Sequence, residues 1–255
     1  MFPLRDNLPT DRPPVVTIAL ILLNAFVYFF LQPKTGIAFE GGLKQGPLVH
    51  YGAIPYEFTH WGSHCDLVQG AVRCAAHGGA HQLPTALTIF SSMFTHAGLL
   101  HLGGNMLFLY IFGNNVEDAM GPVRYLLFYV LGGIAALALQ TAVSPDTTGP
   151  TLGASGAIAA VLGGYILIYP RARVLTLIFI VFFFTFLEIP AFFFLFIWFG
   201  EQAVFGAIGL VHHYGGGGGV AYFAHVGGFV FGLAAIKLFA TRRSSSYGGP
   251  RYPVY

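Results

Sequence analysis

The sequence predicts an all-α membrane protein built as a bundle of six transmembrane helices. Of the 255 residues, 55% are hydrophobic and only 9% are charged, whereas soluble domains carry about 25% charged residues. The 26 phenylalanines supply lipid-facing surface, and the 34 glycines allow helices to approach closely. The net charge of +2 is too small to indicate a nucleic-acid partner. We therefore expect the lipid bilayer to be the main environment of the chain.

Seven apolar stretches are candidates for the helices, and one of them is too short. As a helix, the stretch Val174–Leu187 would be about 21 Å long, less than the ~30 Å hydrocarbon core. Because Arg173 precedes it and Glu188 and Pro190 follow it, we expect an interfacial or re-entrant segment. The other six are the predicted spans: Val15–Leu31, Gly98–Gly113, Val123–Val143, Ala154–Tyr169, Ile189–Leu210 and Val220–Ala240. No signal-peptide cleavage site follows the first, so we expect it to be retained.

The basic residues indicate which side of the membrane each end occupies. With the N-terminus in the cytoplasm, six spans place all of the 12 Lys and Arg residues on the cytoplasmic side except Lys34, Lys44 and Arg73. A seventh span would export Arg242 and Arg243. We therefore expect both termini in the cytoplasm, of a bacterial plasma (inner) membrane.

Four regions follow from this topology. Residues 1–14 form a cytoplasmic N-terminal segment, 15–240 the six-helix membrane domain, and 241–255 a flexible cytoplasmic tail. Residues 33–97 form an extended external loop that contains both cysteines, Cys65 and Cys74. In an oxidising compartment these favour a disulfide. The alternative is a zinc site with nearby histidines, but these lack a repeated metal-ligand spacing. The histidines concerned are His60, His64, His77 and His81. We expect no metal and no cofactor.

Three clusters of polar and small residues interrupt the predicted spans. Gly153–Ala157 opens the fourth span, and Ala224–Gly228 opens the sixth. His96, His101 and Asn105 lie around the start of the second. Polar groups inside a membrane are costly, so they are usually functional or paired. The fourth and sixth spans both start at the external surface, so their polar residues would lie at the same depth.

Small residues on these two spans favour direct contact between Ser155 and His225. The strips are Ser155, Ala159 and Gly163 on one helix, and His225, Gly228 and Gly232 on the other. Such strips let helix backbones come close. A neutral imidazole can then accept the serine proton and activate the hydroxyl as a nucleophile. Alone, the serine also fits an N-cap and the glycines a packing motif. No carboxylate is placed to orient His225, so we expect a Ser–His dyad.

His101 and Asn105 are four residues apart and share a helix face. Peptide hydrolysis passes through a tetrahedral oxyanion, and each donor aimed at it contributes about 3 kcal/mol. Both side chains offer such a donor. The alternative for Asn105 is a structural hydrogen bond to another helix.

The order and spacing of these motifs resemble the rhomboid family of intramembrane serine proteases, over residues 86–240 and the first span. The matching motifs are Phe94–His96, His101–Met106, Gly113–Asp118, Gly121–Arg124, Gly153–Ala157 and Ala224–Gly228. The resemblance is closest to the bacterial six-span form. It implies that Ser155 is the nucleophile and His225 the general base. It also implies His101 and Asn105 as oxyanion donors, with His96, Gly153 and Gly156 supporting the site. Glu117 would brace the cytoplasmic end, and Ile189–Leu210 would be a mobile helix at a lateral gate.

One departure from the family pattern concerns the base. Many members carry an aromatic residue four positions after the nucleophile, which stacks on the histidine, but here that position is Ala159. We expect Phe223 or Tyr165 to hold the imidazole instead.

The sequence thus predicts a serine endopeptidase that cleaves single-span membrane proteins. Two alternatives remain. A non-proteolytic member of the family would only bind membrane proteins, and a histidine-lined transporter would carry metal ions or protons. The sequence gives no oligomeric state.

Overall fold

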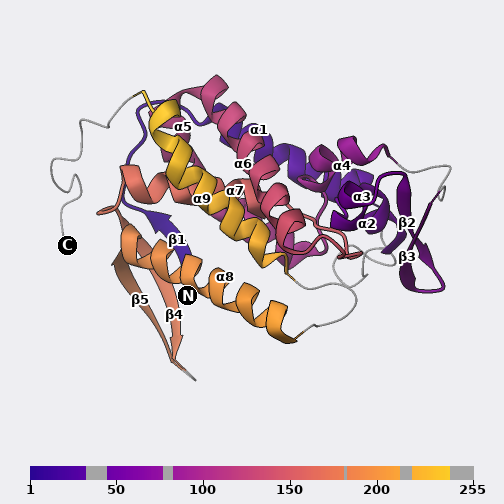
Figure 1. The fold of residues 1–255 in the computed structure, drawn as a ribbon. Coiled ribbons are helices and arrows are strands. Elements are labelled where there is room, and N and C mark those ends of the chain that lie inside the picture. The colour runs from indigo at the N-terminus through magenta and orange to yellow at the C-terminus, as the bar shows by residue number, and fades with distance from the viewer. Residues whose placement is uncertain (33–44, 77–82, 181–182, 213–219, 242–255) are drawn as a thin grey trace.

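The structure is a computed structural model that describes residues 1–32, 45–76, 83–180, 183–212 and 220–241 (Figure 1). It is mostly helical, and each of the six predicted spans is a helix. These helices are α1 (Val15–Phe26) with its π-helical continuation η1 (Val27–Leu31), α5 (Leu99–Met120), α6 (Pro122–Val143), α7 (Ser155–Ile168), α8 (Ala191–His212) and α9 (Tyr222–Phe239). The predicted tail beyond residue 241 lies outside the described residues.

The chain is an integral membrane protein. Among the described residues, three helices are long and apolar enough to cross a membrane: Pro122–Val143, Ala191–Leu210 and Tyr222–Phe239. Two shorter apolar helices, Val15–Leu31 and Ser155–Ile168, accompany them. Helix α5 is as long as α6 but carries more polar side chains, among them Asn105, Glu117 and Asp118. The count of six spans stays a prediction.

Helix α7 is the centre of the bundle, and every residue from Gly156 to Ile166 is buried. Its small residues let α9 approach at backbone distance. A Cβ at position 228 would overlap the carbonyl oxygen of Gly156, and one at position 232 would overlap that of Ala160. Gly163 lies against the backbone of Phe229 in the same way. The predicted close approach of the two small-residue strips is therefore confirmed.

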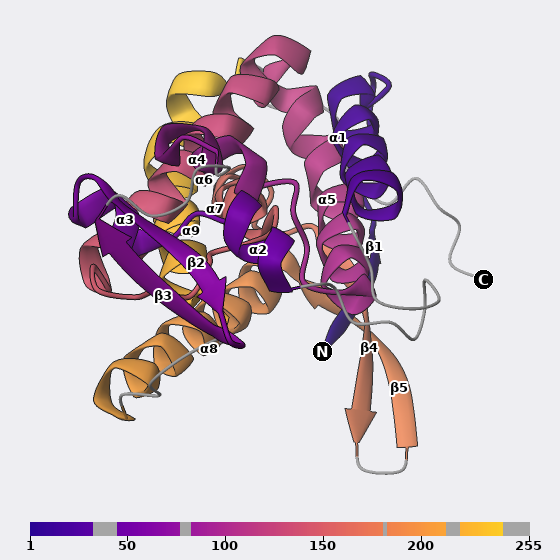
Figure 2. The same cartoon turned by 90° about the vertical axis from the view of Figure 1, so that its right-hand side faces the viewer.

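The expectation of an all-α protein is wrong, because two small sheets accompany the helices. Strands β4 (Arg173–Ile180) and β5 (Phe183–Pro190) form an antiparallel hairpin, and β4 also pairs with β1 (Phe2–Asp6). Val174–Leu187 is thus a β-hairpin and no spanning helix. Its β-branched and aromatic residues favour strands. In both views the hairpin projects away from the helix bundle (Figures 1 and 2). Its placement at the membrane interface stays a prediction.

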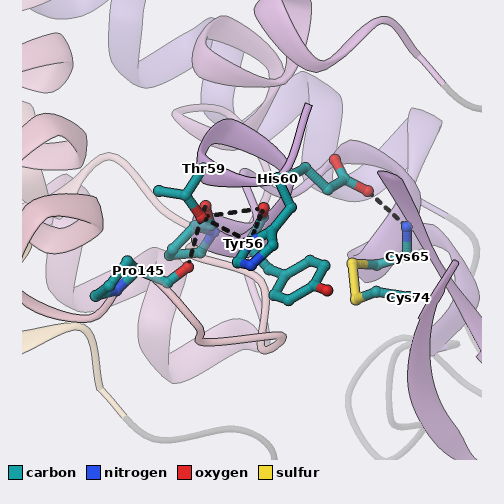
Figure 3. Close-up of a disulfide and its surroundings, with 8 residues drawn as sticks. Tyr56, Thr59, His60, Cys65, Cys74 and Pro145 are labelled. Carbon is teal, nitrogen blue, oxygen red and sulfur yellow. Dashed lines mark hydrogen bonds between the residues drawn. A yellow bond between two sulfur atoms is a disulfide. The ribbon is translucent and has the colours of Figure 1, made fainter. Parts of the chain in front are cut away.

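The predicted external loop contains a second small sheet, β2 (Ser63–Val68) and β3 (Ala71–Ala76). Cys65 and Cys74 face each other across it and form the expected disulfide (Figure 3). Because both sulfurs are joined in the disulfide, neither is available as a thiolate ligand for the alternative zinc site. His77 and His81, two of the histidines considered for that site, lie outside the described residues. Three short helices complete this part: α2 (Gln45–Tyr51), α3 (Pro55–Thr59) and α4 (Thr85–Ser92).

Polar contacts tie the N-terminal segment to the bundle. The Glu117 carboxylate accepts hydrogen bonds from the backbone N–H groups of Val16 and Thr17 at 2.9 and 2.8 Å, which caps α1. The Asp6 carboxylate accepts hydrogen bonds from Asn115 Nδ2 and the Tyr165 hydroxyl, both at 2.6 Å. Burial raises the pKa of Asp6 to about 6, although the Tyr165 hydrogen bond opposes this shift.

Candidate active site

Ser155 is the first residue of α7, and the backbone just before it is tightly constrained. Gly153 has φ +104°, a conformation that glycine adopts without strain. Its N–H donates to the carbonyl of Ser92 at 2.8 Å. Two residues earlier, Thr151 and Ala53 exchange backbone hydrogen bonds at 2.8 and 3.1 Å. The approach to the serine is therefore held by Ala53 and Ser92, which precede α5 in the chain.

Helix α3 holds the beginning of the same connection, residues 144–152. The Thr59 hydroxyl donates to the carbonyl of Pro145 at 2.8 Å (Figure 3). The Tyr56 N–H donates to the carbonyl of Thr147 at 3.1 Å. Because these bonds fix the segment that enters α7, α3 positions Ser155 indirectly.

His225 lies in the first turn of α9 and reaches Ser155 directly. The distance from His225 Nε2 to Ser155 Oγ is 2.7 Å. The preceding residue is also fixed, because the Ala224 N–H donates to Gln140 Oε1 on α6 at 3.1 Å. The two residues that the sequence paired are therefore in hydrogen-bonding contact.

The other ring nitrogen of His225 contacts Gln202, which is not among the residues predicted for the site. Gln202 Oε1 on α8 lies 2.7 Å from Nδ1. Because a carbonyl oxygen can only accept, Nδ1 carries the proton, and the lone pair of Nε2 faces Ser155. Gln202 was detectable, because it and Glu201 are the polar side chains of the apolar stretch Ala191–Leu210. Glu201 is exposed and Gln202 is buried.

The expectation that Phe223 or Tyr165 holds the imidazole is wrong. The ring contact of His225 is with Trp198, whose centroid is 5.8 Å away at an interplanar angle of 35°. The Tyr165 hydroxyl instead binds Asp6, ten residues along α7 from the serine. With Ala159 fully buried against α9, the aromatic contact comes from α8.

His101 and Asn105 lie on α5, directly opposite Gly153. A Cβ at position 153 would lie 2.7 Å from His101 Nε2 and 3.3 Å from Asn105 Nδ2. The Ala97 N–H approaches His101 Nδ1 at 3.4 Å, so Nε2 is the donor of the neutral ring. Asn105 Nδ2 is buried and has no hydrogen-bond partner within the described part of the chain. Two donors thus converge beside Ser155.

His96 is fully buried in the connection before α5. Its ring contacts the ring of His101 edge-on, with the two ring centroids 5.2 Å apart. Its backbone N–H and carbonyl both bond to the Gln32 side chain at 3.0 Å. Burial lowers the pKa of His96 to about 3, so its ring is neutral. These contacts suit the supporting position that the resemblance implies.

A cavity of about 580 Å³ connects these groups. Ser155, His225, His101, Asn105 and Gln202 all line it, together with Gly153, Gly156 and mostly apolar side chains. The cavity therefore brings together a hydroxyl, an imidazole in contact with it and two further side chains that can donate hydrogen bonds, with mostly apolar walls.

Comparison with known proteins gives one consistent result. A family model of the Rhomboid domain matches residues 84–242, more than half of the chain. Rhomboid protein 1, mitochondrial, of Saccharomyces cerevisiae is 33% identical over 97 residues, which cover 36% of this chain and 28% of that protein. RHOMBOID-like protein 1 of Arabidopsis thaliana is 30% identical over 172 residues, which cover 64% of this chain and 37% of that protein.

A third relative is the mitochondrial presenilin-associated rhomboid-like protein of Mus musculus, 31% identical over 96 residues, which cover 37% of this chain and 26% of that protein. The chain therefore spans well under half the length of these relatives. All three are eukaryotic, so they lend no support to a bacterial plasma membrane. The family match extends over every residue of the cavity that carries a polar side chain, from Ser92 to His225. The chain belongs to the rhomboid family.

Proposed function

We propose that this chain is an intramembrane serine endopeptidase that cleaves transmembrane segments of other membrane proteins. The observation that carries the proposal is the 2.7 Å contact between Ser155 Oγ and His225 Nε2. The hydroxyl is a nucleophile only when a base takes its proton, and the unprotonated Nε2 faces it. The side chains of His101 and Asn105 line the same cavity, and Asn105 Nδ2 has no hydrogen-bond partner among the described residues, which supports this assignment.

The reaction follows from this arrangement. Ser155 Oγ attacks the scissile carbonyl carbon while its proton passes to His225 Nε2. The negative charge that forms on the carbonyl oxygen is stabilised by Asn105 Nδ2, His101 Nε2–H and the free N–H groups at the start of α7. His225 then gives its proton to the leaving amine, and the peptide bond breaks to an acyl-enzyme. Water attacks the ester with His225 again as the base, which restores Ser155.

The substrate class follows from the membrane location. We propose six spans with both termini in the cytoplasm, so the cavity lies near the external surface and can admit water. A substrate helix would enter beside α8. It must unwind before its carbonyls are accessible, because an intact helix hydrogen-bonds them internally. Single-span proteins with small or helix-breaking residues near that surface are therefore the expected substrates.

The test replaces the nucleophile alone. Purified protein in lipid vesicles is incubated with a single-span substrate, and the cleavage products are identified by mass spectrometry. Ser155→Ala should abolish cleavage and fluorophosphonate labelling, while Ser63→Ala, on the external strand β2, should leave both unchanged. Cleavage that persists in Ser155→Ala refutes the mechanism. A wild-type protein that binds the substrate without cutting it or labelling would favour the non-proteolytic alternative.

A further inference from the structure

We propose that Gln202 is a positioning residue for the base, and that it makes the dyad competent only while α8 is docked on α9. This inference rests on the proposed function and deepens it. The arrangement would be a relay of three side chains from three helices: Ser155 on α7, His225 on α9 and Gln202 on α8.

The hydrogen bonds at the two ring nitrogens of His225 are equally short, 2.7 Å each. A neutral imidazole has one proton, and its partner at one nitrogen decides which nitrogen carries it. Gln202 Oε1 accepts from Nδ1–H, which leaves the Nε2 lone pair for the serine proton. Without this acceptor, the ring can adopt the other tautomer, in which Nε2–H donates to Ser155 Oγ and no base is present.

Gln202 is well placed to hold the ring, because it is 9% exposed and lies within a packed interface. Trp198 is one helical turn before it and contacts both His225 and Phe229 on α9, at centroid distances of 5.8 and 6.2 Å. Phe199 stacks on Phe229 at 4.6 Å. The imidazole is thus held by two side chains of one helix face, an indole and an amide.

The contact between α8 and α9 near Gln202 differs from the backbone-to-backbone approach between α7 and α9. At Gly206, one turn after Gln202, an added Cβ would meet side chains, Tyr222 Cβ at 3.2 Å and the Phe223 ring at 3.3 Å. Side chains alone therefore join α8 to α9 at these positions. If α8 moves outward to admit a substrate helix, Gln202 leaves Nδ1 while Ser155 and His225 stay on their own rigidly packed helices. Cleavage would then wait until α8 has closed again.

Two replacements of Gln202 separate positioning from packing. Gln202→Met keeps the length of the side chain and suits an apolar interface, but it cannot accept a hydrogen bond. Gln202→Glu keeps an acceptor oxygen for Nδ1–H but brings a carboxylate into a buried position. A packing role predicts that the methionine variant is tolerated and the glutamate variant is damaged. A positioning role predicts the reverse order of activity.

We expect Gln202→Met to lower the kcat for a single-span substrate about 10- to 100-fold, since misorientation of a reacting group costs this much. KM and melting temperature should change little. The kcat of Gln202→Glu should lie no more than about tenfold below that of the wild type. The matched control is Glu201→Met, which makes the same new side chain at the exposed neighbouring position of α8 and should cleave at the wild-type rate.

An NMR spectrum of His225 measures its tautomer directly. In protein labelled with ¹⁵N-histidine, His225 should show a protonated Nδ1 and an unprotonated Nε2 in the wild type. Gln202→Met should show a mixture of both tautomers.

Three results would overturn the inference. They are a Gln202→Met variant that cleaves within threefold of wild type, a glutamate variant less active than the methionine variant, and an unchanged tautomer in Gln202→Met. Each leaves the proposed function standing if cleavage still depends on Ser155. A wild-type protein with no Ser155-dependent cleavage or labelling refutes the proposed function, and this inference with it.

Discussion

Replacing Gly228 with alanine should uncouple the nucleophile from the base. Gly228 lies one turn after His225 on α9, at the point where α9 meets α7 most closely. The new Cβ would overlap the carbonyl oxygen of Gly156 and lie 3.0 Å from its carbonyl carbon and 3.2 Å from Ala159 Cβ. All of these atoms belong to the backbone or to a short side chain, so none can rotate away.

The size of the effect follows from the geometry. To relieve the overlap, α9 must retreat from α7 by about 1 Å, because a tightly packed core has no space to absorb a methyl group. The same shift lengthens the His225 Nε2–Ser155 Oγ distance from 2.7 Å to about 3.7 Å, beyond hydrogen-bonding range. A misplacement of this size costs about 100-fold in rate. The overpacking itself should lower the free energy of unfolding by about 2 kcal/mol.

The assay compares Gly228→Ala with Gly209→Ala, whose added Cβ has no neighbour within 4 Å among the described residues. Both are measured by the rate of fluorophosphonate labelling at Ser155 and by kcat for a single-span substrate. Labelling requires no entry of a substrate helix, so it isolates the dyad from the gate. Wild-type labelling in a folded Gly228→Ala variant would refute the reasoning, because the helices would then have accommodated the methyl group without moving the base.

Three further outcomes follow from the structure. Gly153→Ala should lower kcat about 100-fold, because its Cβ would lie 2.7 Å from His101 Nε2 and displace a proposed oxyanion donor. Steady-state cleavage rates measure this effect. An unaffected kcat would contradict the assignment of His101 and Asn105 as donors. Asp6 should make stability pH-dependent, because its pKa is raised from 3.8 to about 6 and the folded protein therefore holds the proton more tightly than the unfolded chain. As the pH falls through 6 toward 3.8, the free energy of unfolding of the wild type should rise by up to about 3 kcal/mol relative to that of Asp6→Asn. This added stability should be lost again as the pH rises. Thermal unfolding in detergent between pH 4 and 8 measures the difference. Reducing the Cys65–Cys74 disulfide, which closes a short loop, should destabilise the β2–β3 sheet by about 3 kcal/mol. Amide hydrogen exchange in residues 45–76 should therefore become faster. Equal exchange rates before and after reduction would contradict this expectation.

The helices and the pairing at the site could be predicted from the sequence because their signals are local. Apolar stretches mark the helices by length and composition alone. The contact between Ser155 and His225 followed from two further features, the strips of small residues and the start of both helices on one side. Each of these features limits where backbones can lie, so the pairing did not depend on side-chain conformations.

The β-hairpin could not be predicted by the same argument. The length of Val174–Leu187 excludes a membrane-spanning helix but does not by itself indicate a strand. An apolar run of this kind does not distinguish strand from helix by periodicity. The usual turn residues are also absent, because no Asn, Asp or Gly lies between Ile180 and Phe183. The partner strand, Phe2–Asp6, is about 170 residues away in the chain, so the pairing with β4 depends on tertiary structure.

The contact of Gln202 with His225 was unpredictable for a different reason. A polar residue in an apolar helix is a visible signal, but its partner depends on the rotation of α8, and Glu201 was the equally polar neighbour. The packing of Trp198 and Phe199 against α9 helps to fix that rotation. The orientation of the base is therefore a tertiary property, whereas its identity is a property of the sequence.

The two interfaces of α9 differ in how the helices meet, and this difference would let the proposed site be both rigid and gated. Toward α7, carbonyl oxygens lie where a Cβ would be at Gly228 and Gly232, so any separation of these helices would open voids along the backbone. Toward α8, the contacts at Trp198 and Gln202 are made by side chains, which can change rotamer when the helix moves. The distance between nucleophile and base should therefore be the same in open and closed states, and only the orientation of the imidazole should change. Gating would act on the proton acceptor and leave the nucleophile in place.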